Sequence, residues 1–158
     1  MDADTLLASL GSHPFAEKMS PRHLEKLASM AVETTFEKNQ TIFREGDQAA
    51  FFYLIVSGTV GIEVMLPGRA VRIQTLGPGD ELGWSSVLEE RPKYFAACAL
   101  EPVRALALDG VHMRQACRED PEFGYVFIAQ VLEVVASRLQ ATRMQLLDVY
   151  SPEGAKKP

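Results

Sequence analysis

Residues that usually carry metal or redox chemistry are scarce in this sequence of 158 residues. There are only two cysteines, Cys98 and Cys117, which are too few for the four thiolates that an iron–sulfur cluster uses. The three histidines, His13, His23 and His112, fall outside the stretches that predict strands and share no ligand spacing. We therefore expect surface or helix-end histidines, a reduced and buried thiol at Cys98, and no metal site.

Long apolar runs and an excess of positive charge are also missing. No apolar run approaches the roughly 18 residues of a membrane span, and the acidic start Met1-Asp2-Ala3-Asp4 is unlike a signal peptide. We therefore expect a cytoplasmic protein. The net charge is −5 and no basic helix or patch is visible, which disfavours direct nucleic-acid binding.

A catalytic pattern is absent as well. Ser85 and Ser86 have no histidine nearby in the sequence that could act as a general base. We expect these hydroxyls to donate hydrogen bonds or to cap a short helix, and we expect no enzymatic activity.

What the sequence does contain is a series of short strands over roughly residues 32 to 108. Phe51–Val60 is an aromatic and β-branched run, and Ser57-Gly58 divides it into two strands joined by a tight hairpin. Further strands are expected at Gly61–Leu66, Ala70–Leu76, Tyr94–Leu100 and Val103–Leu108. Short strands separated by turn signals predict a mostly β fold with flanking helices, built on a small antiparallel jelly roll or barrel.

Helices are expected on both sides of this β unit. Capping residues mark their starts, because Ser20, Asp109 and Asp120 each precede a segment of helical composition, and proline follows Ser20 and Asp120. The expected helices are Asp2–Leu10, Pro21–Ala31, a helix around Val111–Arg118, and a long one from Asp120-Pro121 to about Tyr150.

The segment Leu76–Leu100 has the form of a phosphate-binding cassette. Gly77 and Gly79 allow a tight turn, and Trp84–Leu88 follows Gly83 as a single helical turn. A loop that leads into a helix start presents free backbone N–H groups, which suit an anion.

This segment resembles the cassette of the cyclic nucleotide-binding domains, the sensor fold of the catabolite activator and nitrate-fumarate regulator group. The usual family pattern is Gly-Glu-Leu-Ala-Leu, a few variable residues, then Arg-Ser/Thr-Ala. Its glycine falls on Gly83, its glutamate on Trp84, its arginine on Lys93 and its small hydroxyl residue on Tyr94. The EGD turn in 42–50, the Ser57-Gly58 hairpin and the last strand occur in the family's order.

The resemblance implies a ligand site at Gly83, Trp84, Ser85, Ser86, Lys93, Tyr94 and Phe95. In the family, the glutamate holds the ribose 2′-hydroxyl and the arginine neutralises the cyclic phosphate. Here Lys93 is the remaining cation and Trp84 replaces the carboxylate, which implies weakened or altered nucleotide recognition. The implied ligand is a cyclic nucleotide or another small anion, and no further cofactor is expected.

The long C-terminal helix carries a heptad seam. Its members are Tyr125, Ile128, Leu132, Val135, Leu139, Thr142, Leu146 and Val149, at alternating spacings of three and four residues. Phe127, Val131 and Val134 form a second apolar face, which we expect to pack on the β domain. A helix with two apolar faces needs two partners, so we predict a homodimer through the seam. In the family this helix is the dimer axis.

The sequence thus divides into helices over 1–31, a β-roll over 32–108 with the cassette at 83–95, helices over 109–150 and a flexible tail at 151–158. Two functions remain open. One is a dimeric regulatory sensor that acts on a separate effector protein, since no helix-turn-helix domain follows residue 150. The other is a protein-interaction scaffold whose pocket is filled by Trp84, Tyr94 and Phe95 as core residues.

Overall fold

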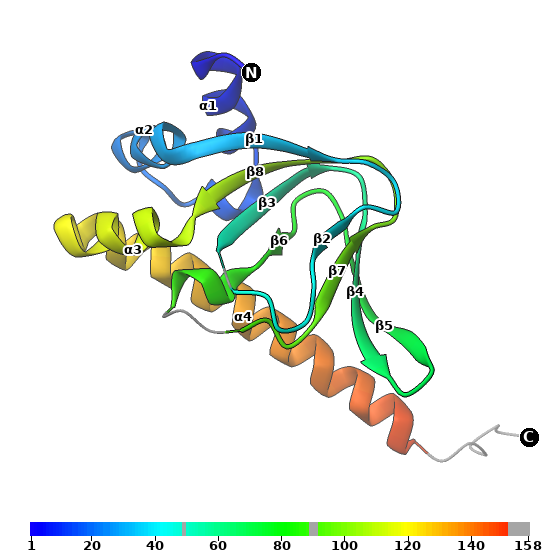
Figure 1. Ribbon diagram of the computed structural model, residues 1–158. Coiled ribbons are helices and arrows are strands. Elements are labelled where there is room, and N and C mark those ends of the chain that lie inside the picture. The colour runs from blue at the N-terminus through cyan, green and yellow to red at the C-terminus, as the bar shows by residue number, and fades with distance from the viewer. Residues whose placement is uncertain (49, 89–91, 152–158) are drawn as a thin grey trace, which may run out of the picture.

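The computed structural model describes residues 1–48, 50–88 and 92–151, and its centre is a roll of two four-stranded antiparallel sheets. One sheet has the order β1-β8-β3-β6 and the other β2-β7-β4-β5 (Figure 1). The strands are β1 Ala31–Phe36, β2 Thr41–Phe43, β3 Phe51–Ser57, β4 Val60–Leu66, β5 Arg69–Leu76, β6 Glu81–Leu82, β7 Ala96–Ala99 and β8 Val103–Asp109. The expected jelly-roll fold with flanking helices is confirmed.

Glycine turns make the hairpins of this roll. Gly58 joins β3 to β4 with a φ of +87°, and Gly68 joins β4 to β5 with a φ of +83°. A Cβ atom at Gly58 would collide with the carbonyl oxygen of Pro102, so the close approach of two chain segments also requires glycine there. The sequence-predicted hairpin at Ser57-Gly58 is confirmed.

The helices begin where the capping residues predict. The helical elements are α1 Ala3–Gly11, η1 Pro14–Ala16, α2 Pro21–Met30, η2 Trp84–Val87, α3 Gly110–Glu119 and α4 Pro121–Tyr150. The side chains of Ser20, Asp109 and Asp120 accept hydrogen bonds from the first turns of α2, α3 and α4. In Figure 1, α4 runs beneath the roll, and its C-terminal half extends past the β4–β5 hairpin.

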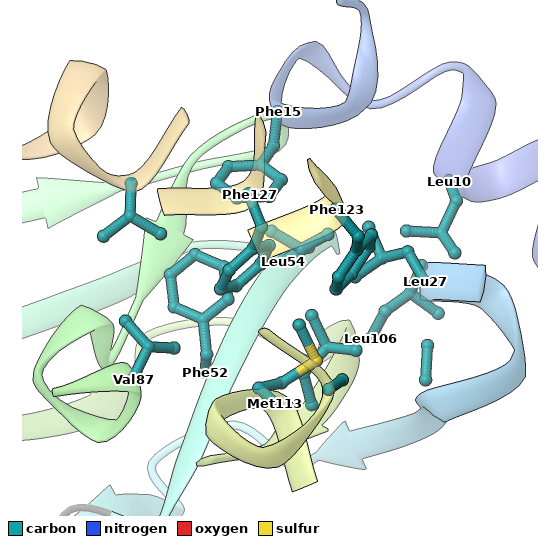
Figure 2. Close-up of a cluster of buried hydrophobic side chains, with 14 of the residues drawn as sticks. Leu10, Phe15, Leu27, Phe52, Leu54, Val87, Leu106, Met113, Phe123 and Phe127 are labelled. Atoms are coloured by element: carbon teal, nitrogen blue, oxygen red, sulfur yellow. The ribbon is translucent and has the colours of Figure 1, made fainter. Parts of the chain in front are cut away.

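The main hydrophobic core joins the N-terminal helices, the β1–β8–β3 sheet and the start of α4. Phe15, Phe52, Phe123 and Phe127 meet at its centre (Figure 2). The ring centroids of Phe15 and Phe127 lie 5.5 Å apart, and those of Phe52 and Phe127 lie 5.9 Å apart. Phe127 and Val131 are buried and Val134 is half-buried against this core, so the predicted second face of the long helix packs on its own domain.

Two expectations need correction, the length of one strand and the burial of Cys98. The strand predicted at Tyr94–Leu100 is the shorter β7, because its neighbour β4 pairs with it only as far as Glu63 opposite Ala96. The histidines lie at helix ends as expected, His13 as the N-cap of η1 and His23 in the first turn of α2. Both are buried: His13 Nδ1 accepts a hydrogen bond from the Phe15 backbone, and His23 packs edge-on against Phe123. Cys98 is a free thiol, but it is half-buried.

Residues 152–158 of the expected tail and 89–91 of the cassette lie outside the described residues. Within the described part of the chain, none of the helices combines the length and the hydropathy that crossing a membrane requires.

Candidate functional site

Gly83 sets the geometry of the cassette. It connects β6 to η2 with a φ of +80°, and an added Cβ would collide with the carbonyl oxygen of Phe51 in β3. Only glycine adopts this conformation at such close approach without strain. The backbone therefore turns sharply here, and η2 is held against the roll.

A cavity of about 440 Å³ opens beside this turn, between the roll and α4. Its volume lies within the ~300–1,000 Å³ range of small-molecule sites. Side chains from β2, β4, β5, β6, η2 and α4 line it, and most of them are apolar. The apolar members include Phe43, Ile62, Ile73, Leu82, Trp84, Leu88, Phe95, Val135 and Leu139, and the polar ones are Gln74, Ser85, Lys93, Tyr94, Arg138 and Thr142.

The structure brings six of the seven predicted site residues together around this cavity: Gly83, Trp84, Ser85, Lys93, Tyr94 and Phe95. Ser86 is the exception. It is fully buried on the other side of η2, where its hydroxyl donates a 2.8 Å hydrogen bond to the Gly83 carbonyl. Its own carbonyl accepts a 2.7 Å bond from Arg114. Ser86 therefore holds the short helix in place rather than facing the cavity, because both its hydroxyl and its backbone carbonyl form hydrogen bonds there.

Lys93 is a buried cation with neutral neighbours. Lys93 is only 7% exposed. Its Nζ donates a 3.2 Å hydrogen bond to the Ser85 hydroxyl and lies 4.5 Å from the centroid of the Phe43 ring. Burial lowers the pKa of Lys93 to about 8, because desolvation penalises the charged form. A hydroxyl and an aromatic face stabilise an ammonium only in part, so this group is suited to an anion.

The three aromatic residues of the cassette do not form a closed core. Trp84 is half-buried: it packs against the main core and also lines the cavity. Tyr94 is 69% exposed and Phe95 is 44% exposed. The scaffold hypothesis needs all three as core residues, and for Tyr94 and Phe95 this expectation is wrong.

Sequence reasoning missed Arg138, a second cation at the cavity. Its side chain comes from α4 and is 20% exposed, and Nη2 lies 3.8 Å from Glu81 Oε2. Among the described residues, Nη2 has no hydrogen-bond partner. Burial lowers the pKa of Arg138, and Glu81 opposes this shift. The position of Arg138 directly before seam residue Leu139 is the one sequence signal that it lies near this face of the helix.

Glu81 was also missed. This buried carboxyl lies in β6, and burial raises its pKa to about 7 although Arg138 acts in the opposite direction. It lines a neighbouring cavity of about 420 Å³ rather than the cavity beside η2. None of the described residues around the latter is an aspartate or glutamate. The carboxylate that the family pattern would place at Trp84 is therefore not supplied by another described lining residue.

The predicted seam of α4 is largely exposed. Leu132 is 65%, Leu139 50%, Leu146 52% and Val149 75% exposed, and Tyr125, Ile128 and Thr142 are exposed too. Val135 differs, because it is half-buried against the main core. Three seam residues, Val135, Leu139 and Thr142, also line the cavity.

The fold of this chain is similar to the folds of solved structures. A cyclic nucleotide-binding domain from Methylobacillus flagellatus superimposes with a TM-score of 0.80 at 18% identity, over 96% of this chain and 86% of that one. The catabolite activator protein of Thermus thermophilus gives a TM-score of 0.71 at 25% identity, over 86% of this chain and 62% of that one.

Several curated relatives are transcriptional regulators. The chain is 29% identical, over 147 residues, to the CRP-like cAMP-activated global transcriptional regulator of Mycobacterium tuberculosis, which covers 92% of this chain and 62% of the regulator. It is 30% identical to the global nitrogen regulator of Nostoc over 73% of this chain and 51% of that protein. The chain thus spans less than two thirds of the length of these relatives. The family model for the cyclic nucleotide-binding domain matches residues 33–120, so this chain belongs to the cyclic nucleotide-binding domain family.

Proposed function

We propose that this chain is a dimeric regulatory sensor module in which a small anionic ligand and the dimer partner act on the same part of α4. The observation that carries the proposal is the shared lining. Val135, Leu139 and Thr142 belong to the heptad seam and also to the wall of the cavity. A ligand that contacts these side chains would change the surface offered to a second copy. By linkage, the second copy would change ligand affinity by the same factor.

The exposed seam supports dimerisation. Leucines at 132, 139 and 146 are each at least half exposed, whereas Phe127 and Val131 on the adjacent face are already buried in the domain's own core. An apolar stripe of this length on a helix of about 45 Å is typical of a protein–protein interface. A second α4 related by two-fold symmetry would present the same stripe and bury both.

We further propose that nucleotide recognition is weakened or altered. Among relatives, the names "cAMP-activated" regulator and "cyclic AMP receptor protein" state a cyclic nucleotide ligand for those proteins. Here Trp84 occupies the position of the ribose-binding carboxylate, and Lys93 supplies a point charge in place of a bidentate guanidinium. Loss of one charge-assisted hydrogen bond costs about 1.5–3 kcal/mol, which is roughly tenfold to a hundredfold in affinity.

The scaffold alternative has less support. It requires a filled pocket, but a cavity of about 440 Å³ remains beside exposed Tyr94 and Phe95. The separate effector protein and the lack of direct nucleic-acid binding stay predictions. The curated relatives include transcriptional regulators and a kinase regulatory subunit, so we propose no catalytic role.

Equilibrium sedimentation of the wild-type chain tests the dimer on which the proposal depends. We expect a dimer at micromolar concentration. A species that stays monomeric throughout this range would contradict the proposed function, whatever the cavity binds.

A further inference from the structure

The chemistry of the cavity beside η2 narrows the class of ligand. Its described wall is mostly hydrocarbon and aromatic, with apolar side chains from strands, from η2 and from α4 on all sides. An apolar body in contact with this wall would be bound favourably, because removing hydrocarbon surface from water is favourable. An ion that is small and fully hydrated, such as inorganic phosphate, would leave most of this wall wet.

Two cations interrupt this apolar wall. Lys93 is buried against a hydroxyl and an aromatic ring, and Arg138 is mostly buried with its Nη2 lacking a hydrogen-bond partner among the described residues. Glu81 lies 3.8 Å from Arg138 but faces the neighbouring cavity. Buried cations are costly unless an anion pairs with them. Among the described residues Lys93 forms no ion pair and Arg138 has only Glu81 at 3.8 Å, so the described wall combines incompletely neutralised positive charge with an apolar surface.

A nucleotide fits this combination poorly. Its ribose hydroxyls and the polar edge of its base need hydrogen-bond partners when they are buried, because a buried polar group without a partner weakens binding. The neutral polar side chains of the described wall are Gln74, Ser85, Tyr94 and Thr142, and the Ser85 hydroxyl already contacts Lys93. Beside them, no described carboxylate is placed to accept from a sugar hydroxyl.

We propose that the ligand of this cavity is an organic acid with an apolar hydrocarbon body, its anionic group held by Lys93 and Arg138 and its body against the apolar wall. This inference rests on the proposed sensor function and gives its ligand a chemical class. Phe43, Ile73 and Leu139 would contact the hydrocarbon body of the ligand. Because Leu139 also belongs to the dimer seam, ligand binding would change the surface that the seam presents to a second copy.

Calorimetry on the full chain with four probes tests this class. Octanoate carries both features, 1-octanol has the apolar body alone, inorganic phosphate has the charge alone, and cAMP represents the nucleotides. We expect octanoate to bind saturably, and roughly tenfold or more tighter than the other three, since a charge-assisted hydrogen bond is worth about that factor.

Variants locate the site. Lys93→Met and Arg138→Gln should each weaken octanoate binding by roughly tenfold while leaving 1-octanol binding unchanged, which separates loss of charge from loss of folding. Arg118→Gln is the matched control. Arg118 lines a different apolar cavity of about 370 Å³ with Val87, Met113 and Phe127, and the substitution should not change octanoate binding.

Several outcomes would overturn the inference. If cAMP or phosphate binds more tightly than octanoate, the ligand class is wrong and the sensor function stands. Equal affinity for octanoate and 1-octanol would remove the role of the two cations. Sensitivity to Arg118→Gln alone would move binding to the other cavity. Failure of all four probes to bind would overturn the ligand class, whereas the sedimentation test of the dimer decides the proposed function separately.

Discussion

Glu81 and Arg138 form a buried ion pair behind the cavity, with 3.8 Å between Oε2 and Nη2. Burial is the largest influence on the Glu81 carboxyl and raises its pKa to about 7, while Asp80 adds repulsion and Arg138 attraction. Protonation of the Glu81 carboxyl is therefore coupled to folding. The free energy of unfolding should depend on pH through Glu81.

The sign follows from proton binding. At pH values between 4.5, the ordinary pKa of glutamate, and about 7, folded Glu81 keeps a proton that the unfolded chain has released. The free energy of unfolding therefore falls as pH rises through this window. Glu81→Gln removes the titration. Between pH 5 and pH 8, the stability of the wild type relative to Glu81→Gln should fall by about 2 kcal/mol. Urea unfolding at several pH values measures this, and parallel pH profiles for the two proteins would contradict it.

Single residues differ in how far the sequence predicts them. Gly83 and Lys93 belong to a local motif, and the resemblance placed both at the cavity. Ser86 has the same motif support but faces the other way, because three successive residues of a tight turn point in different directions. Arg138 lies 45 positions after Lys93 in the chain and reaches the cavity through tertiary packing, which no local pattern encodes.

At the scale of elements, η2 depends on the left-handed backbone of Gly83. Gly83→Ala should cost at least about 2 kcal/mol, because positive φ strains alanine and its Cβ would meet the Phe51 carbonyl oxygen. Gly77→Ala is the control, since nothing lies within 4 Å of the added Cβ there and its φ falls outside the strained range. Denaturant unfolding compares the two. Equal losses of stability would show that the turn does not need glycine.

The long helix α4 carries the dimer prediction. Leu132 is 65% exposed and does not line the cavity, so Leu132→Lys should break the dimer and leave both the folded monomer and the cavity wall intact. Gln140→Lys adds the same charge at an exposed position outside the seam and should stay dimeric. Sedimentation equilibrium with circular dichroism checks this. Equal association of both variants would exclude the seam as the interface.

Elements were predictable where their determinants are local. Helix starts at Ser20, Asp109 and Asp120 and the hairpin at Gly58 follow from side-chain caps and backbone conformation, and the structure confirms them. The pairing of β1 with β8 joins segments some 70 residues apart, and the two-residue strand β6 exists only because β3 lies beside it. Such non-local pairings leave no local sequence pattern.

For the whole molecule, the β roll and the cassette between β6 and β7 supply most of the described cavity wall, and α4 adds Arg138 and part of the seam. The fold follows from the sequence and family membership from the comparison with known proteins. The proposed change in ligand recognition is tested most simply at Trp84, where the resemblance places a carboxylate. Trp84→Glu restores this group, and Trp84→Gln is a control of similar size without the charge.

Calorimetric titration of cAMP into the wild type, Trp84→Glu and Trp84→Gln tests the altered recognition most directly. We expect wild type and Trp84→Gln to bind cAMP weakly. Trp84→Glu should bind it roughly tenfold to a hundredfold more tightly than Trp84→Gln, as one charge-assisted hydrogen bond predicts. Sub-micromolar binding of cAMP to the wild type, or no gain on restoring the carboxylate, would contradict the account.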